Sequence, residues 1–388
     1  MMPPKILVVD DEPDLEILMK QNFRRKIRAG ELEFVFAQNG FQALDRLKEH
    51  PDVSMVLSDI NMPEMDGLTL LDSVSEKYPL IRTVIVSAYG DMKNLRTAMN
   101  NGAFDFVNKP IDFTDLEATV TKTINEITNI KSAEQNRLKL QLVQRELQIG
   151  QTIQKSFLPS FIPKAEGWEI AKIFTPAKEV AGDFFDVYEL PTPNKIGFVV
   201  ADVCGKGVGP ALFMTLIRSL MRAFGEFGSF TEREAEKTIT LTHNYVIRNH
   251  ESANMFATVF IGTVDTLTGK VEYVNCGHNP PYVLRNNKII SELDITDPVV
   301  GLFPNDEFHT NEITLEPGDS LFLFTDGVTD IINPRNELFG DERLRSFLEK
   351  DLTTAEDTLK QLNSALYEHM QTADQFDDIT MLMLRRLK

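Results

Sequence analysis

The chain has 388 residues, a formal net charge of −18 and a sequence pI near 4.8, so it is long enough for two or three domains. Hydrophobic residues make up 42% of the composition and charged residues 25%, which excludes a disordered or fibrous protein. An acidic chain lacks the basic surface that nucleic acids and anionic membranes require, so we expect neither as the main partner.

Cysteine content and hydrophobic runs indicate the cellular context. Cys204 and Cys276 lie far apart and form no metal-binding motif, which fits a reducing compartment. No apolar run approaches the ~18 residues of a membrane span, and the first residues lack the apolar stretch of a signal peptide. We therefore expect a soluble, cytoplasmic protein.

Residues 5–110 alternate short apolar runs with amphipathic segments. Helical patterns occupy segments such as 15–26 and 41–50. The runs between them are too short for helices and are rich in β-branched and aromatic residues, which predicts strands at 6–9, 34–37, 54–58, 83–87 and 104–108. This alternation predicts an α/β doubly wound domain with a five-stranded parallel sheet. Such sheets carry their sites at the carboxyl ends of the strands.

Residues 112–158 are predicted to form one long helix, because they contain no proline and a single glycine. Apolar residues recur at three- and four-residue spacing, first at Val120, Ile124 and Ile127 and later at Leu138, Leu142, Ile149 and Ile153. We expect the first set to dock on the first domain and the second to pair as a coiled coil in a homodimer. The alternative is a solvated spacer helix. Pro159 and Pro163 end the pattern.

From residue 168 onward, alternating apolar runs predict strands joined by turns. Helical segments are expected at 209–226, 231–250 and 341–371. The combination predicts an α+β domain, a β-sandwich flanked by helices. The expected organisation is therefore a first domain at 1–125, a helical linker at 126–158 and a second domain at 159–388.

Three carboxylates are expected to meet in the first domain. Asp10 and Asp11 close the first strand and Asp59 closes the third, and these strand ends converge in a doubly wound sheet. Like charges so close together require a cation, and carboxylate oxygens suit Mg²⁺. Lys109 and Ser87, which end the fifth and fourth strands, add an ammonium and a hydroxyl to the same rim.

The segments VVDDE, LSDINMPEMDG, VSAYG and FVNKP resemble, in order, the signature segments of a two-component response-regulator receiver domain. The resemblance implies that Asp59 is the phosphoacceptor, that a sensor histidine kinase or phosphotransfer protein is a partner, and that Mg²⁺ is held by Asp10, Asp11, Asp59 and the Asn61 carbonyl. It also implies that Ser87 and Lys109 bind the phosphoryl group. Phe106 stands at the position of the family's switch aromatic, and a cis peptide bond is expected at Lys109–Pro110.

A second set of acids lies at strand ends or turns of the later domain, and its members are Asp183, Asp202, Asp326, Asp377 and Asp378. Carboxylates unpaired beside an apolar interior are costly. Two divalent cations would remove that cost, and paired cations are a known device for phosphoryl transfer to water. Glycines beside the acids, at positions 182, 205, 207 and 327, would allow close backbone approach.

The segments VAGDFFD, VADVCGKGVGPALFM, MFATVFIGTVD, VNCGHNPPYVL, LFTDGVTD and FDDITMLML resemble a metal-dependent PPM-type serine/threonine phosphatase of the bacterial stage II sporulation branch. The resemblance implies two Mn²⁺ or Mg²⁺ ions, held by Asp183, Asp202, the Val203 carbonyl, Asp326 and Asp377. Asp378 remains an alternative to Asp377. Ala181 departs from the family's usual glycine.

Other residues of this domain invite competing interpretations. Asp186 is expected to be a solvated strand position rather than an outer ligand. His278, in a turn-forming segment, is expected to be structural rather than an acid–base catalyst. Lys206 either contacts a substrate phosphate or lies exposed on its loop. Of Phe184 and Phe185, alternation predicts that only one is fully buried.

The resemblances together imply a response regulator whose phosphorylation at Asp59 controls a metal-dependent protein serine/threonine phosphatase. The implied substrate is a phosphoprotein such as an anti-sigma-factor antagonist in a partner-switching pathway. The competing hypothesis is a non-catalytic adaptor that combines a receiver with an inactive phosphatase-like domain. An adaptor could lose its metal ligands without consequence, whereas here all four acidic ligand positions, 183, 202, 326 and 377 or 378, are present.

Overall fold

The computed structural model describes residues 3–88, 91–228, 230, 232–304, 307–350 and 353–387. Its chain divides into two compact units, Met1–Leu142 and Val143–Lys388. Within the described residues, every helix is too short or too polar to cross a lipid bilayer.

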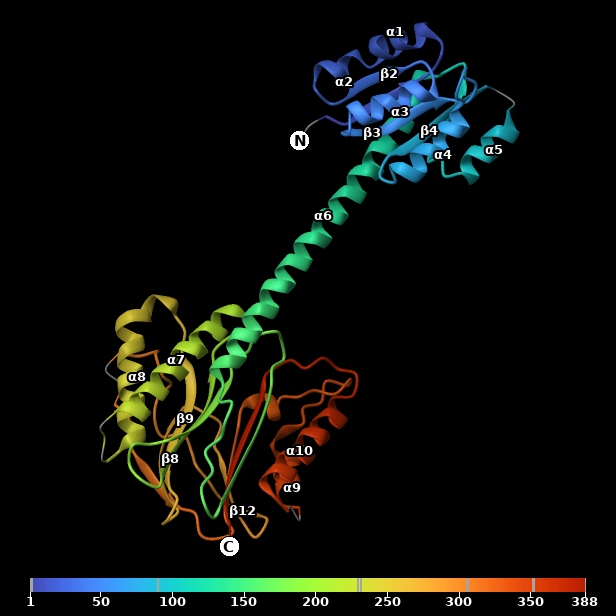
Figure 1. Ribbon diagram of the computed structural model, residues 1–388. Helices are drawn as coiled ribbons and strands as arrows, with labels where there is room; N and C mark the ends of the chain where they lie inside the picture. The colour runs from blue at the N-terminus through green and yellow to red at the C-terminus, as the bar shows by residue number, and fades with distance from the viewer. Residues whose placement is uncertain are drawn as a thin grey trace. The chain divides into compact units, whose positions relative to one another are not determined.

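The first unit contains the predicted five-stranded parallel sheet, with strand order β2-β1-β3-β4-β5 (Figure 1). Its strands are β1 Lys5–Val9, β2 Glu33–Ala37, β3 Val53–Asp59, β4 Arg82–Ala88 and β5 Asp105–Lys109. The helices are α1 Pro13–Asn22, α2 Arg24–Arg28, α3 Gly40–Glu49, α4 Gly67–Lys77 and α5 Met92–Asn100, together with the first turns of α6. Strands β1 and β3 are buried throughout, which explains their continuous apolar runs.

One predicted helix of this unit is wrong in its extent. The segment 15–26 is not continuous, because Phe23 leaves the helical conformation between α1 and α2 (φ −92°, ψ 12°). Its ring is buried and packs edge-on against Phe34, with the centroids 5.3 Å apart. The break between α1 and α2 therefore lies at the residue whose ring is buried, and the apolar pattern of the sequence does not reveal it.

The predicted long helix is confirmed as α6, Phe113–Phe157. Its first turns contribute Leu116, Val120 and Ile127 to the core of the first unit. The later apolar residues, Leu138, Leu142, Ile149 and Ile153, are all exposed. Coiled-coil pairing of this stripe stays a prediction.

The second unit is the predicted sandwich of two antiparallel sheets, in the orders β13-β10-β9-β8-β7 and β12-β11-β14-β15-β6. The first sheet comprises β7 Phe184–Glu189, β8 Lys195–Val203, β9 Ala257–Asp265, β10 Lys270–Cys276 and β13 Asn311–Thr314. The second comprises β6 Trp168–Thr175, β11 Tyr282–Arg285, β12 Lys288–Glu292, β14 Ser320–Phe324 and β15 Ile379–Arg386. The helical segments are α7 Val208–Phe227, α8 Glu234–His250, α9 Gly340–Leu348 and α10 Ala355–Met370, with 3-10 turns η1 Glu251–Ala253 and η2 Asp326–Val328.

Helices cover both outer faces of this sandwich, α7 and α8 on one side and α9 and α10 on the other (Figure 1). A third apolar layer fills the space between the sheets. Phe184 packs toward α7 and α8, whereas Phe185 packs between the sheets, and each is almost wholly buried. The expectation that only one of them is buried was therefore wrong, because both faces of β7 are covered.

The helix predicted at 341–371 is also wrong, since two helices, α9 and α10, occupy this range. The second of them has its own start signal. The Thr354 side chain accepts a hydrogen bond from the backbone N–H of Asp357, which caps the first turn of α10.

Candidate metal and catalytic sites

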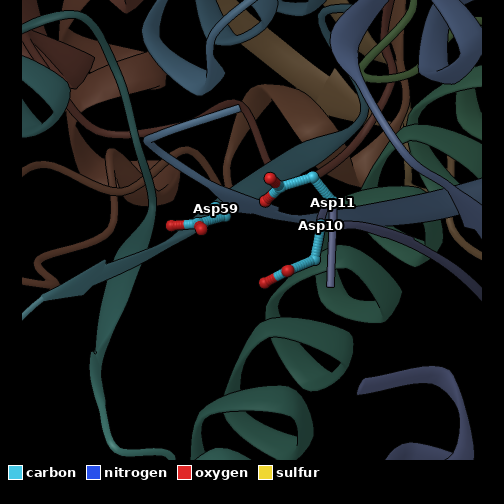
Figure 2. Close-up of side chains that lie close together, drawn as sticks. All are labelled: Asp10, Asp11 and Asp59. Carbon is cyan, nitrogen blue, oxygen red and sulfur yellow. The ribbon is translucent and has the colours of Figure 1, made fainter. Parts of the chain in front are cut away.

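The three acids of the first unit meet where the sequence predicts. Asp10 and Asp11 follow β1 and Asp59 ends β3, and these strands are neighbours in the sheet. One carboxylate oxygen from each lies within 4.8 Å of the others, and Figure 2 shows the three side chains around one space. Asp10 and Asp59 are buried and Asp11 is exposed. This arrangement of hard oxygen ligands, open on one side, fits a divalent cation such as Mg²⁺.

Lys109 reaches this cluster from the end of β5. Its Nζ lies 2.8 Å from Asp59 Oδ2 and 3.0 Å from Asp10 Oδ2. Burial opposes the charge of Lys109, but the contacts with Asp59 and Asp10 raise its pKa above the usual value. Burial raises the pKa of Asp10, against the effect of its hydrogen bonds. The ammonium thus offsets part of the repulsion between the acids.

The other expected receiver residues surround the same edge of the sheet. Ser87 is buried near the end of β4, beside β3, and the exposed Asn61 follows Asp59 by two residues. Phe106 is half-buried in β5. The Lys109–Pro110 bond is cis, as expected. The last two residues of the segment VSAYG, 89 and 90, lie outside the described residues.

The second group of acids forms one electrostatic cluster in the sandwich unit. Burial, followed by the charges of Asp202 and Asp378, raises the pKa of Asp183 well above its usual value. Burial and the charge of Asp326 raise the pKa of Asp202 to about 7. Burial and the charge of Asp377 raise the pKa of Asp326. Carboxylates that disfavour one another's ionised form in this way are typical of a site where bound divalent cations offset the repulsion between them.

Two threonines that the sequence interpretation missed orient Asp183. The hydroxyls of Thr325 and Thr380 each donate to Asp183 Oδ2 over 2.7 Å. Both threonines are fully buried. The sequence indicates this role only by their positions: Thr325 directly precedes Asp326, and Thr380 lies two residues after Asp378. Because these bonds occupy Oδ2, they leave Oδ1 for the acid cluster.

Asp377 and Asp378 are engaged differently. Asp378 is buried, and its two oxygens accept the backbone N–H groups of Ala177 and Gly182 over 2.8 and 2.9 Å. Asp377 is half-buried and its charge acts on Asp326. Asp378 therefore holds the backbone that leads to Asp183, and its charge also acts on Asp183, whereas the charge of Asp377 acts on Asp326.

Two of the four glycines beside the acids permit close approach, as expected. A Cβ added to Gly182 would lie 2.9 Å from the Val203 carbonyl oxygen, and one added to Gly327 would lie 1.9 Å from the Asp378 carbonyl oxygen. Gly205 and Gly207 instead adopt positive φ angles of 90° and 102°, a conformation that side chains disfavour.

Asp186 is not the solvated position that strand alternation predicted. It is 1% exposed, and its carboxylate lies 2.9 Å from Arg218 and 2.9 Å from Arg222, both on α7. Burial raises the pKa of Asp186, while the two arginines lower it. Since α7 packs over β7, it supplies the counter-charges that make burial of this acid tolerable.

The remaining ambiguous residues also find partners. Lys206 Nζ lies 2.8 Å from Asp377 Oδ2 and donates to the Phe376 carbonyl oxygen over 2.7 Å, so Lys206 is not simply an exposed loop residue. His278 is fully buried, its Nδ1 lies 3.0 Å from Thr258 Oγ1, and burial lowers its pKa to about 3. A buried, neutral imidazole supports the expected structural role.

Comparisons with known proteins match both units. Residues 6–121 match the response regulator receiver domain and residues 192–387 match stage II sporulation protein E. The chain is 36% identical over 263 residues to protein IcfG of Synechocystis sp., an alignment that covers 62% of this chain and 41% of IcfG. It is 27% identical over 248 residues to phosphoserine phosphatase RsbU of Bacillus subtilis, covering 63% of this chain and 71% of RsbU.

The chain thus spans less than half the length of IcfG. Among solved structures, the SiaA-PP2C domain of Pseudomonas aeruginosa has the same fold as part of the chain, with a TM-score of 0.54 and 21% identity. That likeness covers 64% of this chain and 98% of the SiaA domain. The match to stage II sporulation protein E, over residues 192–387, spans half of the sequence. The chain therefore belongs to the stage II sporulation protein E family and carries a response regulator receiver domain ahead of the family's domain.

Proposed function

We propose that this chain is a response regulator whose output is a metal-dependent protein serine/threonine phosphatase. The observation that carries the proposal is the cluster of Asp183, Asp202 and Asp326, whose pKa values are raised by burial and by their neighbours' charges. The complete acid set argues against the non-catalytic adaptor. The corresponding domains are a receiver at 1–125, a linker at 126–158 and a phosphatase at 159–388.

In this proposal, two Mn²⁺ or Mg²⁺ ions are held by Asp183, Asp202, the Val203 carbonyl, Asp326 and Asp377. Asp377 is preferred to Asp378, because its charge acts on Asp326 and one of its oxygens pairs with the Lys206 side chain, whereas both oxygens of Asp378 accept N–H groups from the backbone segment before Asp183. The ions, when bound, supply the positive charge that stabilises phosphoryl transfer to water. Lys206, beside Asp377, adds a cation at the same site.

The receiver would be phosphorylated at Asp59 by a sensor histidine kinase or a phosphotransfer protein. Asp10, Asp11 and the Asn61 carbonyl would hold Mg²⁺ there, and Lys109 and Ser87 would bind the phosphoryl oxygens, with Phe106 as the switch aromatic. The position of Lys109, 2.8 Å from Asp59 Oδ2, supports this assignment.

The substrate would be a phosphoserine or phosphothreonine protein, such as an anti-sigma-factor antagonist, which makes partner switching the pathway. RsbU, similar over 63% of this chain, is a phosphoserine phosphatase. The exposed apolar stripe of α6 supports a homodimer through the linker. The low cysteine content, two residues in 388, and the required kinase favour a cytoplasmic location.

The test is hydrolysis of p-nitrophenyl phosphate by the full chain with and without Mn²⁺. We expect Mn²⁺-dependent hydrolysis by the wild type, and loss of hydrolysis with retained folding in Asp326→Ala, which removes a ligand and also relieves repulsion between carboxylates. Asp374→Ala, which alters a nearby exposed acid, should keep the wild-type rate. Full activity of Asp326→Ala would contradict the two-metal site.

A further inference from the structure

The side-chain amide of Gln154 is buried in the second unit, where it binds both the N–H and the C=O group of the Ala181 backbone. Gln154 is 7% exposed. Its Nε2 donates to the Ala181 carbonyl oxygen over 2.8 Å, and its Oε1 accepts the Ala181 backbone N–H over 2.9 Å. Nε2 also lies 3.4 Å from the Ala211 carbonyl oxygen of α7. One side chain thus pairs with Ala181 as a neighbouring strand would.

This contact compensates for a lack of regular structure. Residues 176–183 connect β6 to β7 and belong to no helix or strand. Ala181 is fully buried, so its N–H and C=O groups require partners within the protein. Gln154 supplies both. Asp378 supplies the partners of Ala177 and Gly182, so two side chains hold this segment.

The held segment leads directly to the acid cluster. Asp183 follows Ala181 by two residues, and its Oδ2 is fixed by Thr325 and Thr380. With Oδ2 fixed, the direction in which Oδ1 points depends on where the backbone at residues 181–183 lies. Gln154 and Asp378 together hold that backbone, and Gln154 binds both polar groups of the Ala181 peptide.

We propose that Gln154 is a positioning residue for the metal site, because its amide fixes the Ala181 peptide and thereby the carboxylate of Asp183. This inference rests on the proposed function, in which Asp183 is a metal ligand. Gln154 belongs to α6, the helix whose first turns lie in the receiver core. A displacement of α6 at Gln154 therefore displaces the Ala181 peptide and changes the affinity of the site for metal.

The experiment uses the full chain with Gln154→Glu and Gln154→Ala. The glutamate keeps the size of the side chain and accepts the Ala181 N–H, but it cannot donate to the carbonyl oxygens of Ala181 and Ala211. Gln148→Ala is the matched control, because Gln148 lies on the same helix and its side chain is exposed. All variants carry Asp11→Asn to weaken the receiver's own metal site.

The first measurement is equilibrium binding of Mn²⁺, followed by the electron paramagnetic resonance signal of the free ion. We expect both Gln154 variants to bind Mn²⁺ about tenfold more weakly, the change expected for one or two lost hydrogen bonds, and the control to bind as the parent does. At saturating Mn²⁺, their rates of p-nitrophenyl phosphate hydrolysis should approach that of the parent. The second measurement is amide hydrogen exchange, which should become faster across residues 177–183 in both variants.

Unchanged Mn²⁺ affinity in folded Gln154→Glu and Gln154→Ala would overturn the inference, even if their melting temperatures fell, because Gln154 would then serve stability alone. If Gln154→Ala fails to fold, Gln154→Glu decides. A parent protein without Mn²⁺-dependent hydrolysis would overturn the proposed function as well. An active parent with unaffected variants overturns only the role of Gln154.

Discussion

Gly327→Ala places one methyl group against the backbone of the metal site. Gly327 lies in η2 next to Asp326, and an added Cβ would lie 1.9 Å from the Asp378 carbonyl oxygen, whereas real Cβ atoms essentially never come within 3.0 Å of such a neighbour. The Asp326–Gly327 and Asp377–Asp378 segments must therefore separate by about 1 Å. Such overpacking typically costs about 1–3 kcal/mol of stability. A 1 Å misplacement of catalytic groups can lower the rate about 100-fold.

Two measurements check this prediction, thermal unfolding and p-nitrophenyl phosphate hydrolysis at saturating Mn²⁺. We expect a lower melting temperature and about a 100-fold lower rate. Gly209→Ala is the control, because Gly209 is exposed in α7 and an added Cβ there meets nothing within 4 Å. That variant should keep the wild-type rate. A Gly327→Ala protein with normal stability and rate would refute the claim that the close backbone approach positions Asp326 and Asp377.

Three further predictions test the charges and the linker. Asp186→Ala should lower the free energy of unfolding by about 3–5 kcal/mol, because it removes the counter-charge of buried Arg218. Chemical denaturation measures this change, and a loss below about 1 kcal/mol would argue against the buried pair. Relative to Asp202→Asn, the metal-free wild type should lose stability as pH rises from about 4 to about 7. The reason is that the folded pKa of Asp202 is about 7 against an ordinary 3.8, so the folded state binds more protons in that window. A difference in melting temperature, wild type minus Asp202→Asn, that is flat or rises with pH would be inconsistent with this. Leu142→Lys with Ile149→Lys should weaken dimerisation in sedimentation experiments, and a wild type that is monomeric in both phosphorylation states would rule out the coiled coil.

The first unit could be predicted closely because its information is local. Continuous apolar runs mark strands buried on both faces, and β1 and β3 show that burial throughout. The ends of neighbouring parallel strands lie at one edge of the sheet, so Asp10, Asp11 and Asp59 had to come together there. Four ordered segments and a converging set of acids are a stronger signal than any single motif.

The features that sequence missed depend on partners from distant elements. Asp186 follows the strand alternation of a solvated residue, and only the packing of α7 over β7 brings Arg218 and Arg222 to it. Gln154 is one polar residue among many on a long helix, and nothing local indicates that its amide pairs with Ala181. Tertiary packing, rather than local propensity, determines both contacts.

The central claim is that phosphorylation of Asp59 controls the phosphatase. The most direct test is the Mn²⁺-dependent rate of p-nitrophenyl phosphate hydrolysis by the full chain, with and without beryllofluoride and Mg²⁺, which mimic the phosphorylated receiver. Asp59→Ala, measured under the same conditions, controls for any action of beryllofluoride on the phosphatase site itself. We predict a change in rate in the wild type that Asp59→Ala does not show. Equal responses of the two proteins would contradict control by the receiver.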